Sequence, residues 1–267
     1  MRLFLGVTMG WMLLRPQLVM DAASQACRLF VQSVLPGLFP YMTLSLMLTS
    51  RMGASMPRWL ILLLGWCGGS PTGARLMALQ GLRDRRLGVM CATMSPMFLL
   101  GTLGGWLQSP AAGVCILLGV ILGGWLTGLL APPGDGQIGT ASSSPLSPGQ
   151  AADAVSRTML MVCGTMVLLR VLAALTAEML PWLALPLTTL LEVTCGAREI
   201  ARLPLPLCLR SALLSGAAGM GGAAIMMQNR SAAPQGLFPL PMQMLFQLLH
   251  GAISFVLTLG FALLAGI

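Results

Sequence analysis

Residues 56–78 read MPRWLILLLGWCGGSPTGARLMA, and residues 179–201 read MLPWLALPLTTLLEVTCGAREIA. Aligned without a gap, the two segments are identical at nine of 23 positions. The identities include a Trp (Trp59 and Trp182) and a Gly-Ala-Arg triplet at 73–75 and 196–198. In both copies a hydrophobic stretch stops at small or polar residues and restarts with this triplet. Paired, interrupted apolar segments in two halves of a chain are typical of a transporter's binding site.

The composition places the chain in a membrane. Hydrophobic residues make up 56% of it and charged residues 8%, whereas a soluble domain carries about 25% charged residues. Charges this sparse cannot cover a surface that faces water. We therefore predict an all-α polytopic membrane protein in contact with the lipid bilayer. The net charge of +8 comes from Arg residues scattered among apolar ones. This pattern fits short cytoplasmic loops and argues against nucleic-acid binding.

The residues that usually carry catalysis or metal binding are sparse. The seven Cys residues form no Cys-x-x-Cys motif, and His250 is the single His of the sequence. A metal centre needs clustered ligands, and the sequence offers no clear pairing of a nucleophile with a base. We therefore predict neither an enzyme nor a bound metal or other cofactor.

One hydrophilic stretch divides the chain near its middle. Residues 132–150, PPGDGQIGTASSSPLSPGQ, are rich in turn-forming residues and predict a flexible linker outside the bilayer. We expect residues 1–131 to form a first repeat half, with a membrane segment at 2–14 and an amphipathic helix at 17–35. Residues 151–267 are expected to form the second half. The apolar runs suggest roughly seven to nine crossings, whose parity leaves parallel and inverted repeats both open.

The repeat extends beyond its identical core. Besides the interruptions at residues 68–73 and 192–196, the apolar pattern is interrupted at Ser95-Pro96 and at 219–222. In each half the second break follows the first at a separation of 23 residues. Each half is therefore expected to contain two broken or re-entrant helices near the midplane of the membrane.

Helix breaks inside a bilayer have a chemical consequence. They expose backbone N–H and C=O groups, which is tolerated only where these face protein or a wet cavity. The positive N-terminal ends of half-helices can then hold an anionic group. The alternative for any single break is a kink that allows close packing. Because four breaks recur at matched spacing, we predict a site whose candidate substrate-binding residues are Ser70, Pro71, Thr72, Gly73, Arg75, Ser95, Pro96, Glu192, Thr194, Gly196, Arg198, Gly219, Gly221, Gly222, Gln228 and His250.

Four ionisable residues stand out within the apolar segments. Glu192 follows a long apolar arm, and intramembrane acids are costly and usually functional. It can carry a coupling proton or cation, or it can form a structural ion pair with Arg198 or Arg75. These two Arg residues match across the repeat and can attract a carboxylate or anchor the interface by snorkelling. His250 is either a binding residue or a hydrogen-bonded structural histidine.

Six short stretches, taken in order, carry a resemblance to a known family. They are LPGLFPYM at 35–42, GGSPTGAR at 68–75, SPMF at 95–98, LLEVTCGAR at 190–198, GMGGAAIMMQ at 219–228 and LLHG at 248–251. Through them the chain resembles the YlbJ-like sporulation integral membrane proteins, which belong to the broader nucleoside-recognition (Gate) membrane family. The resemblance implies an inverted-repeat transporter-like fold in a bacterial cell membrane. It also implies a role in endospore formation, where members are associated with moving dipicolinate, a small aromatic dianion, across the outer forespore membrane.

The chain departs from the family pattern at several polar positions. Residues 68–71, Gly-Gly-Ser-Pro, replace the usual Ser-Gly-Tyr-Pro, and Ser95 replaces the usual Asn. Ala224 and Met226 stand where Ser and His are common, and Gln247 stands where a basic residue is expected. Three hypotheses follow: a transporter of a small organic anion such as dipicolinate, a sporulation membrane scaffold or assembly protein without transport, and a nucleoside-type carrier. The sequence leaves substrate identity, coupling ion and oligomeric state open.

Overall fold

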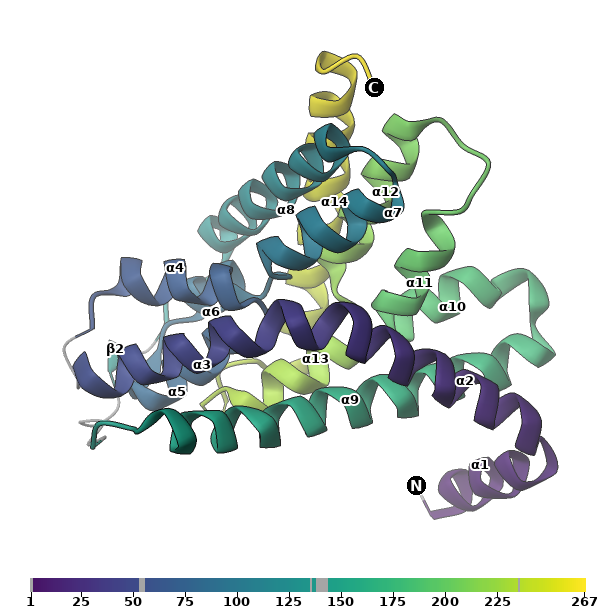
Figure 1. Ribbon diagram of the computed structural model, residues 1–267, viewed down its shortest axis with the longest axis horizontal. Coiled ribbons are helices and arrows are strands. Elements are labelled where there is room, and N and C mark those ends of the chain that lie inside the picture. Colours follow the sequence, from purple (N-terminus) through teal and green to yellow (C-terminus); the bar gives the residue numbers. More distant parts are fainter. Residues whose placement is uncertain (1, 53–55, 135, 138–143, 235) are drawn as a thin grey trace.

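The computed structural model describes residues 2–52, 56–134, 136–137, 144–234 and 236–267, and almost all of its secondary structure is helical (Figure 1). The exception in this part of the chain is a short antiparallel ladder between β1 (Leu82–Arg83) and β2 (Gly136–Gln137). In chain order the helices are α1 (Arg2–Leu14), α2 (Pro16–Leu29), the π-helical η1 (Phe30–Val34), α3 (Leu35–Met52), α4 (Arg58–Gly68), α5 (Thr72–Leu79), α6 (Arg85–Cys91), the π-helical η3 (Met97–Leu103), α7 (Gly104–Trp106), α8 (Pro110–Leu130), α9 (Pro148–Met179), the 3₁₀-helical η4 (Pro181–Leu183), α10 (Ala184–Leu191), α11 (Val193–Ile200), α12 (Leu207–Met220), α13 (Gly222–Ala232) and α14 (Leu240–Leu264).

Several of these segments are long and apolar enough to cross a membrane. Within the described residues there are five: Pro16–Met52, Pro110–Leu130, Pro148–Met179, Leu207–Ala232 and Leu240–Leu264. Their outward faces are apolar as well, since Leu118, Leu122 and Leu129 of α8 are all exposed. Apolar side chains on an outer face suit contact with lipid chains. The protein is therefore an all-α polytopic membrane protein, as its composition predicts.

The same order of elements occurs twice along the chain. The first series is the rod α2–η1–α3, the broken pair α4 and α5, the broken pair α6 and η3–α7, and the unbroken α8. The second series is the long α9, the broken pair α10 and α11, the broken pair α12 and α13, and the unbroken α14. Each of the four predicted interruptions contains a break between helices: residues 69–71, residues 92–96, Glu192 and Gly221.

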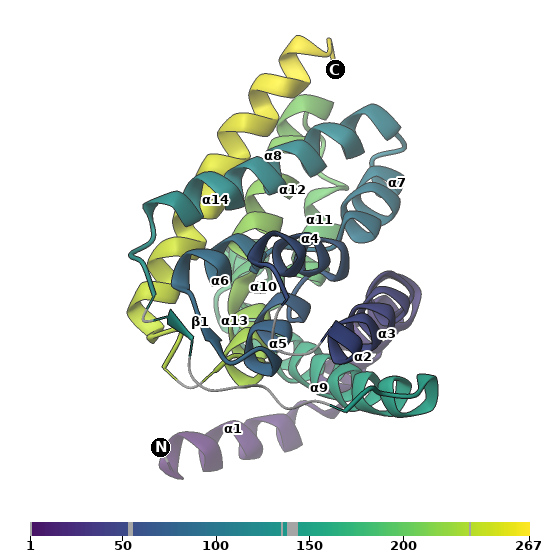
Figure 2. The same ribbon diagram turned by 90° about the vertical axis from the view of Figure 1, so that its left-hand side faces the viewer.

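Two matched pairs of helices lie side by side and antiparallel (Figures 1 and 2): the rod α2–η1–α3 beside α9, and α8 beside α14. Arg15, just before α2, pairs with Glu178 near the end of α9, with Nε 2.8 Å from Oε1. At the other end of the rod, the Leu146 N–H that precedes α9 donates to Ser50 Oγ of α3 at 3.0 Å. Inverted repeats related by an axis in the membrane plane require antiparallel matched helices. The packing therefore fits the inverted alternative.

The segment from Pro16 to Met52 differs from the prediction. An amphipathic helix at 17–35 was expected to end at the following prolines, but the helix runs on through Pro36 and Pro40. A proline inside a helix removes an N–H donor and crowds the carbonyl one turn earlier. The π-helical turn η1 lies directly before Pro36 and widens the helix where that crowding occurs. This local adjustment accounts for the passage of the helix through Pro36, and Pro40 lies within α3 beyond it.

The predicted linker at 132–150 is anchored at both of its described ends. Gly136 and Gln137 pair with Arg83 and Leu82, and α9 begins at Pro148, inside the predicted linker. Ser147 caps α9 in a capping box with Gln150. Residues 135 and 138–143, the middle of this predicted linker, lie outside the described residues.

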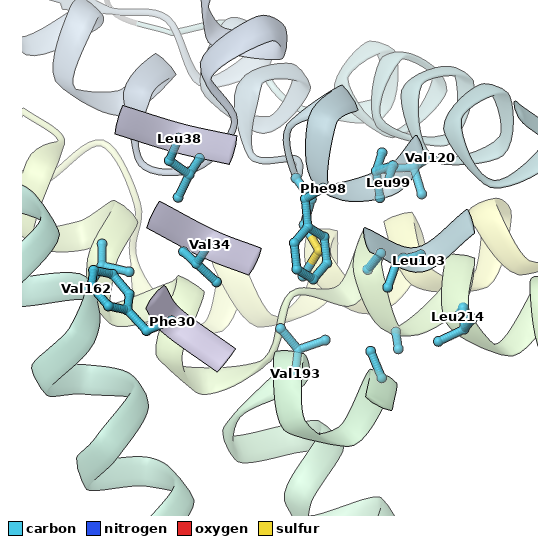
Figure 3. Packing of buried hydrophobic residues seen from close by; sticks show 14 of the residues in the cluster. Phe30, Val34, Leu38, Phe98, Leu99, Leu103, Val120, Val162, Val193 and Leu214 are labelled. Carbon is cyan, nitrogen blue, oxygen red and sulfur yellow. The ribbon is translucent and has the colours of Figure 1, made fainter. Parts of the chain in front are cut away.

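The main hydrophobic core joins the two series. Figure 3 shows side chains from η1, α3 and α11 around Phe98 of η3. The same cluster includes Val162 of α9 and Leu214 of α12. In this cluster the ends of the broken helices pack closely against each other. That packing fixes where the breaks lie relative to one another.

Candidate functional site

Residues at or just after all four helix breaks line one cavity of about 40 Å³. The polar lining residues are Ser70, Ser95, Glu192, Thr194 and Gln228. All five are buried, and all five are among the residues predicted from the sequence. The remaining lining side chains are apolar: Val34, Leu38, Met94, Phe98, Val162, Met166, Ala224 and Ile225. We call this space the central cavity.

The first break, residues 69–71 between α4 and α5, is held by contacts with the second break and with α13. Gly69 has φ +64°, and a Cβ there would lie 2.5 Å from the Ser95 nitrogen, so glycine is required. The Ser70 N–H donates to Thr93 O at 2.7 Å. The Ser70 hydroxyl donates to Oδ1 of Asn229 in α13. The first break is thus tied to the second break and to the helix after the fourth.

The third break, between α10 and α11, is closed by its own carboxylate. Glu192 is 1% exposed and stands at the N-cap of α11. Its Oε1 accepts from the Thr194 N–H at 3.0 Å, and its Oε2 accepts from the Cys195 N–H at 2.6 Å. A negative charge at a helix N-terminus satisfies orphan donors and interacts favourably with the helix dipole. Within the described residues Glu192 makes no ion pair with Arg75 or Arg198, the two partners considered from the sequence.

The second and fourth breaks complete the walls of the central cavity. Ser95 Oγ accepts from the Phe98 N–H at 3.3 Å, at the start of η3. Gly221 and Gly222 have φ of +74° and +67°, and a Cβ on Gly222 would lie 3.0 Å from Leu190 O. The fourth break therefore packs against the end of α10, and glycine makes both the turn and this approach possible.

Arg75 and Arg198 do not line the central cavity. Arg75 Nη1 donates to Ala154 O at 3.0 Å and to Thr158 Oγ1, both on α9, beside a separate hollow of about 430 Å³. The Arg198 guanidinium lies over the Trp106 ring, 5.5 Å from its centroid. Neither is therefore placed to attract a carboxylate within the central cavity, which was one of the two roles considered from the sequence. Arg75 is held by hydrogen bonds to α9, and Arg198 by its cation–π contact with Trp106 of α7.

Three predicted glycines lie at close helix contacts away from the lining. A Cβ on Gly73 would lie 2.3 Å from Cys91 Cβ, and one on Gly196 would lie 2.4 Å from Thr189 Oγ1. A Cβ on Gly219 would lie 3.0 Å from His250 O. At these three positions glycine allows two helices to pack closely, which is the alternative to a binding role considered from the sequence. Gly219 also lies inside α12, because that helix ends at Met220.

The other predicted residues also lie outside the lining. His250 is buried, with Nε2 2.9 Å from Val120 O, as expected of a hydrogen-bonded structural histidine. Pro71 and Pro96 are the N-cap residues of α5 and η3. Thr72 is the first residue of α5, and its Oγ1 is buried without a hydrogen-bond partner.

The sequence analysis did not single out one half-buried cation, Arg170. Arg170 lies in the middle of α9, where Nε donates to Gln25 Oε1 at 2.9 Å and Nη1 donates to Thr188 Oγ1 at 3.0 Å. Its Nη2 is 3.6 Å from Glu199 Oε1. Arg170 therefore joins α2, α9, α10 and α11 and holds the third break in place. The available signal was a charged residue inside a long apolar run, which is usually functional or paired.

The central cavity combines apolar walls with a few converging polar groups, as small-molecule sites do. A volume of about 40 Å³ holds only a few water molecules, whereas ligand pockets typically measure about 300–1,000 Å³. The cavity is therefore much smaller than a typical ligand pocket. Within the described residues no group of three or more His, Cys, Asp or Glu side chains is placed to hold a metal ion.

Comparisons with protein-family models, with curated proteins and with solved structures found no match to this chain.

Proposed function

We propose that this membrane protein transports a small organic anion, and that the central cavity is its binding site. One observation carries the proposal: residues at or just after four helix breaks, two from each series, line a single cavity. Backbone breaks within a bilayer are stable only beside protein or a wet cavity. Convergence of all four on one space is the arrangement by which transporters of this kind expose half-helix ends to a solute.

The lining suits a small ring that carries hydrogen-bonding groups. Val34, Phe98 and Met166 offer apolar surface, while Ser70, Ser95 and Gln228 offer polar atoms on different sides. An apolar wall takes up a ring, and a few fixed polar groups set its orientation. Transport then requires the helices around the breaks to move apart, because the cavity is smaller than such a ring.

The finer assignment is to dipicolinate and to endospore formation, and it rests on the resemblance to the YlbJ-like family. On this proposal the protein acts in the bacterial cell membrane, at the outer forespore membrane of sporulating cells. Normal dipicolinate content in spores of a deletion strain would contradict it.

Uptake into proteoliposomes tests the transport proposal directly. The purified full chain should take up radiolabelled dipicolinate faster than protein-free liposomes, and unlabelled dipicolinate should compete. No dipicolinate flux above the protein-free control would contradict anion transport. If deletion still blocked sporulation, that result would favour a membrane scaffold or assembly role.

A nucleoside-type carrier is the second candidate, and one observation favours it. Glu192 is the ionisable residue among the lining residues, whereas Arg75 and Arg198 lie elsewhere. An acid repels a dianion but accepts hydrogen bonds from an uncharged ligand. Competition for uptake by nucleosides against dipicolinate separates the two candidates: the anion carrier predicts inhibition by dipicolinate alone.

A further inference from the structure

Each of the two repeated segments contains the start of a short helix after a break. One of these helix starts binds a carboxylate of the protein and the other does not. α5 and α11 are each eight residues long, and each begins directly at a break. At α11 the N–H groups of Thr194 and Cys195, the second and third helical residues, bind the Glu192 carboxylate. α11 therefore shows how this fold holds a carboxylate at a break: one oxygen on each of two successive backbone donors.

α5 offers the corresponding donors without a carboxylate. Its N-cap is Pro71, which supplies no side-chain acceptor. Counted from the start of the helix, its second and third residues are Gly73 and Ala74, and within the described residues their N–H groups have no acceptor. Orphan donors at a helix start favour an anion.

Two buried side chains at this helix start also lack partners. Asn229 reaches it, because its Oδ1 accepts from Ser70 Oγ, yet Asn229 Nδ2 is buried and unpartnered. Thr72 Oγ1 at the first helical position is likewise buried and unpartnered. Both residues are 2% exposed. Buried donors are almost always satisfied in native structures, so both atoms, together with the backbone donors, point to a missing acceptor.

We propose that the start of α5, with Ser70, Thr72 and Asn229, is a subsite for a carboxylate group of the transported solute. Ser70 lines the central cavity, and Thr72 and Asn229 lie behind it, so the subsite adjoins the wall of that cavity. Glu192 plays the equivalent part within the protein at α11, so the solute is held with a carboxylate toward α5 and away from Glu192. This inference rests on the proposed function and adds to it an orientation and a recognition group.

Asn229→Asp tests the subsite, because it places a carboxylate at the start of α5 with almost no change of shape. The added acid should occupy the donors as Glu192 does at α11. Binding of dipicolinate to the purified full chain, measured by titration calorimetry, should weaken by more than about tenfold, since like charges side by side are strongly unfavourable. The affinity for the uncharged diamide of dipicolinate should fall much less in the same variant. Gln243→Glu is the matched control, because Gln243 is also buried with an unpartnered Oε1 but lines a different cavity.

Asn229→Ala guards against a general folding effect. It removes the donor without adding charge, so it should weaken dipicolinate binding less than Asn229→Asp does. The Asp variant should melt at a higher temperature than the Ala variant when no ligand is present. Unchanged dipicolinate binding in Asn229→Asp, or an equal loss in Gln243→Glu, would overturn the subsite. If dipicolinate flux persists while Asn229→Asp has no effect, the subsite fails and transport stands; if no flux occurs at all, the proposed function fails.

Discussion

The break between α4 and α5 and the break between α10 and α11 come from one repeated segment, yet they end differently. At α11 the protein supplies its own carboxylate, Glu192, and every polar atom of that side chain is used. At α5 the cap is Pro71 and buried donors are left without acceptors. The difference indicates that a repeated scaffold can close one of its helix ends with protein and leave the other for a ligand. An asymmetric site then follows from two similar halves.

The largest effect is expected from removing the carboxylate that closes the third break. Glu192→Ala leaves two buried N–H groups without an acceptor, each of which loses a charge-assisted hydrogen bond. The free energy of unfolding should fall by about 3 kcal/mol, measured by denaturant titration in detergent micelles. Glu192→Gln keeps one acceptor oxygen and should lose about half as much. Equal stability of Glu192→Ala and the wild type would show that the two breaks do not differ in the way described.

Adding a methyl group at the matched glycines sharpens the comparison. Gly73→Ala and Gly196→Ala should each cost about 2 kcal/mol through overpacking, seen as lower melting temperatures. The first clash is with the Cys91 side chain, whereas the second includes the Thr189 backbone, 2.5 Å from the new Cβ. Adding Cys91→Gly to Gly73→Ala should therefore restore much of the lost melting temperature. Adding Thr189→Gly to Gly196→Ala should not.

The control for both glycine variants is Gly164→Ala. Nothing lies within 4 Å of a Cβ at Gly164 in α9, and alanine favours helix. Its melting temperature should equal or slightly exceed that of the wild type. A large loss in this control would mean that glycine replacements destabilise the chain for reasons unrelated to the breaks.

A smaller effect is expected from cutting the tie that holds the third break. Arg170→Met removes bonds to Gln25, Thr188 and Glu199 and should cost about 1.5 kcal/mol in unfolding free energy. Part of that cost comes from leaving the Glu199 carboxylate unpaired. The double variant Arg170→Met with Glu199→Gln should therefore lose less unfolding free energy than the two single variants lose together. Additive losses would contradict coupling between these residues. Exposed Arg202 provides the control, Arg202→Met, which should be nearly neutral.

The smallest effect concerns the Arg residues that match across the repeat. Arg198→Ala removes a cation–π contact with Trp106 worth about 0.5–1 kcal/mol. If Arg198 acts only through this contact, dipicolinate affinity should stay unchanged when measured alongside stability. A loss of affinity exceeding about tenfold without a change in stability would instead place Arg198 in the solute's path.

The sequence predicted the parts of the fold that repeat and the residues that interrupt apolar runs. The breaks predicted at 68–73, 95–96, 192–196 and 219–222 follow from Gly, Pro and polar residues within hydrophobic stretches, and the structure has a break in each place, at residues 69–71, 92–96, Glu192 and Gly221. Continuity through Pro36 could not be predicted, because it depends on a π-helical turn that no residue type specifies.

Side-chain direction was harder to predict than position along the chain. Ser70, Glu192 and Gln228 face the central cavity, while Arg75 turns to α9 and Arg198 to Trp106. Spacing in a sequence places a residue near a break but does not say which neighbour its long side chain will reach. Arg170 and Asn229 were missed because their roles depend on partners more than a hundred residues away along the chain, Gln25 and Ser70.

Filling the central cavity tests the main claim most directly. Ala224 is buried, lines the cavity and needs no hydrogen bond, so Ala224→Leu adds bulk where the solute is proposed to bind. Exposed Ala111 at the start of α8 provides the matched control, Ala111→Leu. In proteoliposomes, with each variant eluting as the wild type does in gel filtration, dipicolinate uptake should be lost in Ala224→Leu and retained in Ala111→Leu. Uptake by Ala224→Leu at the wild-type rate would contradict the assignment of this cavity as the transport site.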